Sequence, residues 1–272
     1  MIDSCVHTHS SFCDGKNTLS EMAEKAYSLG LKAMGFSGHS YVSIDDFGIL
    51  PHKLDEYLAE SSRLKSLYEG KMDILCGIEL DKFSADTIDT SKFDYIIGSV
   101  HAITDNFGMY RVIDGSLNRF VSAAEEGFGG SFLSLCSGYY DQLCDFVLKT
   151  KPDIVGHFDL ITKFNRGSKY FDEESSNYKN IALEAIDAIL ENDPVIEVNT
   201  GCIARGYRDK PYPADFILKR ILEKKGRVII TTDAHNVDML VSNTDMAADI
   251  LRSVGFKAVC ELSASGFYER EI

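Results

Sequence analysis

The chain has 272 residues, of which 44% are hydrophobic and 26% are charged. This composition supplies a full apolar core and excludes wholesale disorder, and the length is ordinary for a single α/β barrel domain, which we expect to span residues 1–272. Acidic residues outnumber basic ones by 42 to 28, a net charge of −14, which argues against a broad surface for nucleic acid or anionic lipid. A small anion can still bind at a local site.

In chain order the predicted elements are strand 4–6, helix 18–29, strand 32–36, helix 54–68, strands 72–78 and 95–100, helix 139–149, strand 154–156, helix 175–190, strand 195–198, helix 214–225, strand 228–231, helix 244–254 and strand 258–262. The first helix opens on a capping box, Thr18 to Glu21, and ends at Gly30. The segment 102–130, rich in Gly and Asn, is predicted to hold at most one short helix. The repeated strand–helix unit favours parallel strands in a barrel or an open doubly wound sheet.

The targeting and cysteine patterns predict a cytoplasmic protein. The first residues form no signal peptide, and no apolar run is long enough to cross a membrane. The seven cysteines are scattered and include no C-x-x-C pair, so we expect reduced thiols that pack mostly in the core. We expect a monomer or a small homo-oligomer.

The positions of the histidines carry the functional signal. Six of the seven follow predicted strands, and two carboxylates occupy equivalent positions. In a parallel barrel the carboxyl ends of all strands converge on one face, so these side chains are expected to meet in one cavity. With Asp14 the set is His7, His9, Asp14, His39, Glu79, His101, His157, Asp233 and His235. The remaining histidine, His52, is expected to be structural.

These nine groups are typical of a polynuclear metal site. Histidine and carboxylate together suit Zn, Mn or Fe(II), and nine groups are too many for one tetrahedral ion, so we expect two or three divalent ions. His7 and His9 are two residues apart on a strand and therefore point to the same side. Asp233 and His235 repeat that spacing, and Glu79 can bridge two ions through its two oxygens.

The motifs in this set resemble those of the polymerase-and-histidinol-phosphatase (PHP) family of metal-dependent phosphoesterases. They are His7-Thr8-His9-Ser10, Phe12-Cys13-Asp14-Gly15, Gly38-His39, Gly77-Ile78-Glu79, Gly98-Ser99-Val100-His101, Gly156-His157-Phe158-Asp159 and Thr232-Asp233-Ala234-His235. The resemblance implies a distorted (β/α)₇ barrel with a di- or trinuclear centre. It implies one ion at His7, His9, Glu79 and Asp233, a second at Glu79, His101 and His157, and a third at His39, His235 and Asp14.

Longer stretches resemble the histidinol-phosphatase branch of the family: Ser137 to Asp141, Gly156 to Phe164, and Glu197 to Pro213. This resemblance implies hydrolysis of L-histidinol phosphate, a step of histidine biosynthesis. For such a reaction we interpret Asp233 as the group that orients and deprotonates the attacking water.

Three further side chains are expected to contact the substrate. Arg205 is expected to clamp the phosphate, because a guanidinium matches phosphate oxygens in pairs. Ser37 and Lys163 are further candidate phosphate contacts. The loop 41–47 and the segment 102–130 follow ligand-bearing strands and either cover the substrate or pack as ordinary loops.

Other functions compatible with the motifs are a PHP phosphoesterase acting on another small phosphate ester or nucleotide, an amidohydrolase-like C–N hydrolase, and a metal-binding scaffold without catalysis. The net charge of −14 argues against a nuclease, which would carry a basic and aromatic binding track. Glu79 and the Asp233–His235 pair favour a phosphoesterase over an amidohydrolase.

Overall fold

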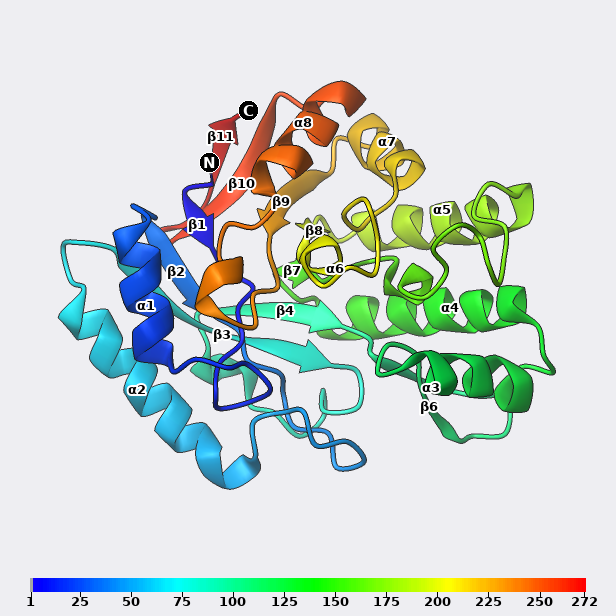
Figure 1. Ribbon diagram of the computed structural model, residues 1–272, viewed down its shortest axis with the longest axis horizontal. Coiled ribbons are helices and arrows are strands. Elements are labelled where there is room, and N and C mark those ends of the chain that lie inside the picture. Colours follow the sequence, from blue (N-terminus) through cyan, green and yellow to red (C-terminus); the bar gives the residue numbers. More distant parts are fainter. Residues whose placement is uncertain (1) are drawn as a thin grey trace.

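Parallel strands form a curled sheet in the computed structural model of this protein, which describes residues 2–272 (Figure 1). Across the sheet the parallel strands are β1 (Ser4–Cys5), β2 (Ala33–Phe36), β3 (Asp73–Asp81), β4 (Tyr95–Ser99), β7 (Ile154–Val155), β8 (Val195–Asn199), β9 (Arg227–Thr231) and β10 (Ala258–Ser263). A last strand, β11 (Gly266–Glu271), pairs antiparallel with β10. The expected distorted barrel is thereby confirmed.

Helices cover the outer side of the sheet, as Figure 1 shows. The outer helices are α1 (Leu19–Ser28), α2 (Leu54–Leu67), α4 (Phe132–Thr150), α5 (Ser176–Leu190), α7 (Asp215–Glu223) and α8 (Thr244–Val254). Two short helices, α3 (Leu117–Ser122) and α6 (Gly201–Ala204), belong to the connections that follow β6 and β8. The predicted capping box is present: the Thr18 hydroxyl accepts from the Glu21 N–H, and the Glu21 carboxylate accepts from the Thr18 N–H. Within residues 2–272, no helix combines the length and apolar character needed to cross a membrane.

The structure corrects the prediction in three places. Helix α4 begins at Phe132, seven residues earlier than expected, because the Ser131 hydroxyl accepts from the Ser134 N–H and caps it there. The segment 102–130 holds the expected short helix, α3, but also an antiparallel hairpin of β5 (Ala102–Thr104) and β6 (Tyr110–Val112). Strand β11 was not predicted, because its polar and exposed residues lack the apolar alternation of a buried strand.

The seam of the barrel, between β1 and β10, is closed by the buried side chain of Glu261. Its carboxylate accepts from the Ser4 N–H at 2.8 Å and from the Ser4 hydroxyl at 2.6 Å, and it also accepts from the Asp3 N–H. On its other side, Arg270 of β11 donates to the same carboxylate at 2.7 Å. The Glu261 side chain therefore links β1 to β10 at this seam, where backbone hydrogen bonds link the other neighbouring strands.

The floor of the barrel is a small apolar cluster around Tyr95. The Tyr95 hydroxyl donates to the Phe36 carbonyl at 3.2 Å and to the Val6 carbonyl, and Ile97, Ile154 and Ile229 belong to the same cluster. The Tyr95 ring fits because Gly77 has no side chain: a Cβ there would lie 2.4 Å from the ring. This floor supports the cavity at the carboxyl ends of the strands.

Candidate metal centre and active site

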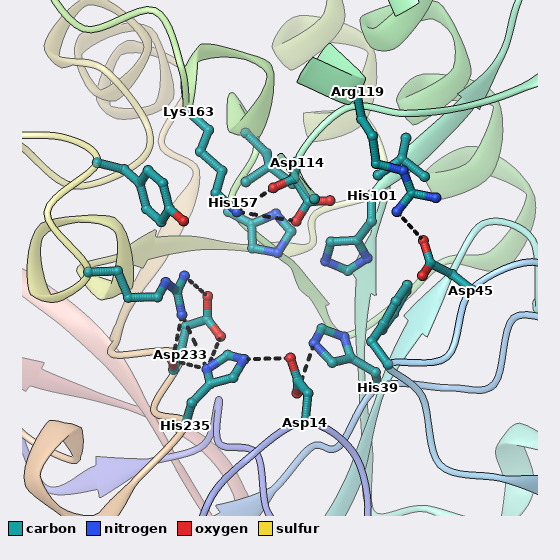
Figure 2. A pocket seen from close by; sticks show the side chains of 16 residues that line it. Asp14, His39, Asp45, His101, Asp114, Arg119, His157, Lys163, Asp233 and His235 are labelled. Atoms are coloured by element: carbon teal, nitrogen blue, oxygen red, sulfur yellow. Dashed lines mark hydrogen bonds and ion pairs between the residues drawn. The ribbon is translucent and has the colours of Figure 1, made fainter. Parts of the chain in front are cut away.

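Two short backbone pairings beyond the named strands bring distant predicted ligands together. The His9 N–H donates to the Ala234 carbonyl at 2.8 Å, and the Ala234 N–H donates to the His7 carbonyl at 3.1 Å. These bonds set the segment 7–9 beside the segment 233–235. In the same way, the Glu79 N–H donates to the Gly38 carbonyl at 3.1 Å, which sets His39 beside Glu79. The structure thus gathers all nine predicted ligands at one end of the barrel (Figure 2 shows six of them).

Glu79 lies at the centre of this cluster and is almost fully buried. Its Oε1 is 3.0 Å from Nε2 of His157 and 3.3 Å from Nε2 of His101. Its Oε2 is 2.7 Å from Nδ1 of His39 and 3.3 Å from Nε2 of His7. The two oxygens therefore face different sets of imidazoles, which is the arrangement that a bridging carboxylate requires.

Several atoms of the cluster are buried and close to one another, yet make no hydrogen bond of acceptable geometry among residues 2–272. They are Nε2 of His7 and His9, Nδ1 of His39 and His157, and Oε2 of Glu79. Buried polar groups in proteins almost always make a hydrogen bond, so several that make none in one place require an explanation. A bound metal ion would provide it. The histidine and carboxylate donors fit divalent ions such as Zn, Mn or Fe(II).

Asp14 lies at the more open side of the cluster, with its side chain 39% exposed. Its carboxylate is 3.2 Å from Nε2 of His235 and 3.6 Å from Nε2 of His39, and His9 completes a group that could hold an ion. Two other groups of this kind are His7 with His9 and Glu79, and His39 with Glu79 and His101. The three sets overlap, so the ions they would hold are close neighbours.

Two carboxylates that were not predicted as site residues contact the Nδ1 atoms of His7 and His101, on the side of each ring that faces away from Glu79. Glu197 accepts from Nδ1 of His7 and from the His157 N–H, and Asp81 lies 3.2 Å from Nδ1 of His101. Such partners set the tautomer and orientation of a metal-ligating histidine. The sequence offered a signal for each: Glu197 is the only carboxylate in the otherwise largely apolar strand β8, and Asp81 is two residues from Glu79, on the same side of β3.

Asp233 and Arg205 form an ion pair at the cavity wall. A guanidinium nitrogen of Arg205 donates to the Asp233 carboxylate at 2.7 Å, and the other terminal nitrogen donates to the Asp233 carbonyl at 3.2 Å. Asp233 has a φ of 48°, a strained conformation of the kind that clusters at functional sites. A Cβ at Gly201 would lie 3.0 Å from Arg205 and from the Asp233 side chain, so this pairing needs a glycine there.

The two buried carboxylates of the cluster, Glu79 and Asp233, are held in their ionised form. Burial alone raises the pKa of Glu79, but the neighbouring imidazoles, led by His39, hold that pKa well below its usual value. Arg205 likewise keeps the pKa of the buried Asp233 well below its usual value. Burial and nearby imidazoles lower the pKa of His9 to about 3, so His9 is neutral at pH 7, the form that ligates a metal.

The cluster opens into a cavity of about 320 Å³. Lys163 and Arg205, both predicted substrate contacts, line it. Ser37 does not: it is fully buried, and its hydroxyl accepts from the Thr8 N–H at 2.9 Å. The structure therefore does not support the predicted phosphate contact of Ser37, whose hydroxyl also donates to the Thr8 carbonyl at 3.4 Å. His52 lies exposed, away from the cavity.

The cavity also has lining residues that sequence reasoning did not single out. Both loops expected near the substrate contribute, and the additional residues with polar or aromatic side chains are Asp45, Phe47, Asp114, Arg119 and Tyr207. Arg119 donates to the Asp45 carboxylate at 3.0 Å and so joins the two loops at one side of the cavity (Figure 2).

Comparison with known proteins places this geometry among relatives. The PHP-domain family matches residues 5–201, a segment that ends before Asp233 and His235. A probable histidinol-phosphatase of Schizosaccharomyces pombe is 24% identical over 274 aligned residues, which cover 93% of this chain and 87% of the relative. The histidinol-phosphatase of Bacillus subtilis is 27% identical over 255 residues, which cover 84% of this chain and 92% of the relative.

Among solved structures, the histidinol phosphate phosphatase of Lactococcus lactis is similar, with a TM-score of 0.70 and 20% identity. The match covers 98% of both chains, and that crystal structure contains zinc, L-histidinol and phosphate. At this identity the likeness establishes a shared fold.

Proposed function

The chain belongs to the PHP-domain family, and on this basis we propose that it is a metal-dependent phosphomonoesterase that hydrolyses L-histidinol phosphate to L-histidinol and phosphate. The carrying observation is the set of buried imidazole nitrogens around Glu79 that lack a hydrogen-bond partner within residues 2–272. The names of the full-length relatives support the choice of substrate. The reaction belongs to histidine biosynthesis.

We assign His7, His9, Glu79 and Asp233 to a first ion, and Glu79, His101 and His157 to a second. His39, His235 and Asp14 would hold a third. Divalent ions at such positions supply a nucleophile at neutral pH and neutralise charge on the phosphoryl oxygens. The donor set suits Zn, Mn or Fe(II).

The protein groups around these positions have distinct tasks. Arg205 presents its guanidinium to a phosphoryl oxygen and keeps Asp233 ionised. The ionised Asp233 carboxylate orients the attacking water and accepts its proton. Lys163, whose side chain is only 13% exposed, adds a second positive charge to the wall of the cavity. Glu197 and Asp81 keep the imidazoles in position throughout.

The cysteines bear on the compartment in which the reaction takes place. All seven are free thiols, as predicted. Reduced cysteines are typical of a reducing compartment, which supports our proposal that the enzyme acts in the cytoplasm. We propose a monomer or small homo-oligomer whose partner is a small phosphorylated metabolite.

Phosphate release from L-histidinol phosphate by metal-replete protein tests this function. The panel includes a nucleoside monophosphate and p-nitrophenyl phosphate at equal concentrations, with a dihydroorotate-like amide as a probe of C–N hydrolysis. We expect kcat/KM to be highest for L-histidinol phosphate. Preference for a nucleotide would replace the substrate but keep the enzyme class, and release of phosphate from none of the esters would reject the class.

A further inference from the structure

Asp114 is a carboxylate on the cavity wall that belongs to none of the three groups able to hold an ion. It follows β6 in the segment between His101 and α3, and Figure 2 shows it beside Lys163 and near His157. Burial tends to raise its pKa, but Lys163 and the imidazoles of His101 and His157 lower the pKa overall. Asp114 is therefore ionised at neutral pH and cannot serve as a proton donor.

The Asp114 carboxylate lies near Lys163 without accepting a hydrogen bond from it. Lys163 donates to the Asp114 backbone carbonyl at 2.6 Å, but its nitrogen is 3.6 Å from the carboxylate, beyond ordinary hydrogen-bond distance. The other carboxylate outside the cluster, Asp45, is paired with Arg119 at 3.0 Å. The charge of Asp114 is thus paired with Lys163, but its carboxylate accepts no hydrogen bond from that group and retains acceptor positions on the cavity wall, whereas the Asp45 carboxylate already accepts from Arg119.

An ionised carboxylate at this place suits a substrate that itself carries a positive charge. Lys163 offsets part of the repulsion that Asp114 would exert on a bound phosphate dianion, but the carboxylate offers a purely anionic ester no favourable contact of its own. A substrate that brings an ammonium group reverses the sign of this interaction. In L-histidinol phosphate the ammonium is on the carbon next to the ester CH₂ group, so it stays close to the phosphate.

We propose that the Asp114 carboxylate binds the substrate ammonium and thereby selects phosphate monoesters of 2-amino alcohols over esters that lack the amine. This assignment rests on the proposed phosphatase function and adds a specificity residue to it. Lys163, held by the Asp114 carbonyl, stays beside the carboxylate and faces the phosphate. The two charges of the wall then match the two charges of the substrate. Val112 and Leu160 supply apolar wall for its carbon skeleton.

The test compares L-histidinol phosphate with its des-amino counterpart, 3-(imidazol-4-yl)propyl phosphate, in the wild type and in Asp114→Asn. Asparagine keeps the size and the backbone carbonyl that Lys163 uses but removes the charge. We expect kcat/KM for the ammonium ester to fall about 10- to 100-fold, as for loss of a charged hydrogen bond, and kcat/KM for the des-amino ester to rise. The Kd of L-histidinol, measured by calorimetry, should weaken by a similar factor.

Asp45→Asn is the matched control, because it neutralises the other cavity carboxylate, and it should leave the ratio between the two esters unchanged. An equal fall for both esters, a rise for both, or no change in Asp114→Asn would overturn the assignment. So would a wild type that hydrolyses the two esters equally well, while leaving the phosphatase function intact. A wild type that releases phosphate from neither ester would reject the proposed function, and the Asp114 assignment with it.

Discussion

Glu197 accepts a hydrogen bond from Nδ1 of His7, which leaves Nε2 of that imidazole facing Glu79 and Asp233. Both residues are fully buried. The contact fixes which nitrogen carries the proton and aims the other lone pair at the centre of the cluster. A residue that contacts neither substrate nor ion in our assignment therefore determines the geometry of one that does.

Glu197→Gln is expected to lower metal affinity about 10- to 100-fold. Each carboxylate oxygen of Glu197 accepts two hydrogen bonds. Oε1 accepts from Nδ1 of His7 and the Thr231 hydroxyl, and Oε2 accepts from the backbone N–H of His157 and the Asn199 amide. The NH₂ group of a glutamine would face a donor in either orientation. Titration of metal-free protein with Zn²⁺ against a competing chelator measures the effect. Glu60→Gln, on α2 and away from the cluster, is the control, and equal affinities in both variants would contradict the role of Glu197.

Arg205→Ala is expected to lower kcat/KM for the phosphate ester about 100-fold, because it removes a charged donor from the cavity and the partner of Asp233. Arg205→Lys keeps the charge but loses the paired donors, so its kcat/KM should lie between those of the wild type and Arg205→Ala. Steady-state kinetics measures both variants. Arg208→Ala is the matched control: Arg208 pairs with Glu173 at 2.7 Å outside the cavity, so its loss should lower Tm and leave KM near the wild-type value. Unchanged kinetics in Arg205→Ala would remove it from the site.

Glu261→Ala is expected to lower the free energy of unfolding by about 3–5 kcal/mol. The substitution leaves the Asp3 and Ser4 donors and the Arg270 guanidinium without their acceptor at the barrel seam. Urea denaturation followed by circular dichroism measures the change. Glu269→Ala, an exposed position on β11, should stay within about 0.5 kcal/mol of the wild type. If both variants unfold at the same urea concentration, the seam does not depend on Glu261.

Removal of metal by a chelator is expected to abolish phosphate release and to lower Tm, since an ion that binds only the folded state stabilises it. The secondary structure should persist, because the backbone hydrogen bonds of the sheet do not depend on the side chains that would hold an ion. Activity should return on addition of Zn²⁺, Mn²⁺ or Fe²⁺, and the order of the three identifies the preferred ion. Full activity in protein whose metal loss has been verified by elemental analysis would contradict a metal-dependent reaction.

The alternation of strands and helices was predictable because each element is encoded locally. The Thr18–Glu21 capping box and the helical spacing of Leu54 to Leu67 rest on residues a few positions apart, and both appear in the structure as expected. Strand β11 escaped prediction because it is an exposed edge strand, in which charged residues replace the apolar alternation. Helix α4 was placed too late because its early cap, Ser131, adjoins a Gly-rich segment typical of a loop.

The sequence by itself determined the architecture and which histidines and carboxylates gather in one cluster, since parallel strands in a barrel bring their carboxyl ends to one face whatever the details of packing. Only the tertiary structure decided how each polar side chain is used. The Ser37 hydroxyl serves the Thr8 backbone, Glu197 serves His7, and Asp114 stays open to the cavity, although all three are ordinary polar residues in the sequence. The physical reason is that hydrogen-bond partners of a buried group come from distant segments, and no local pattern records which segment will lie opposite.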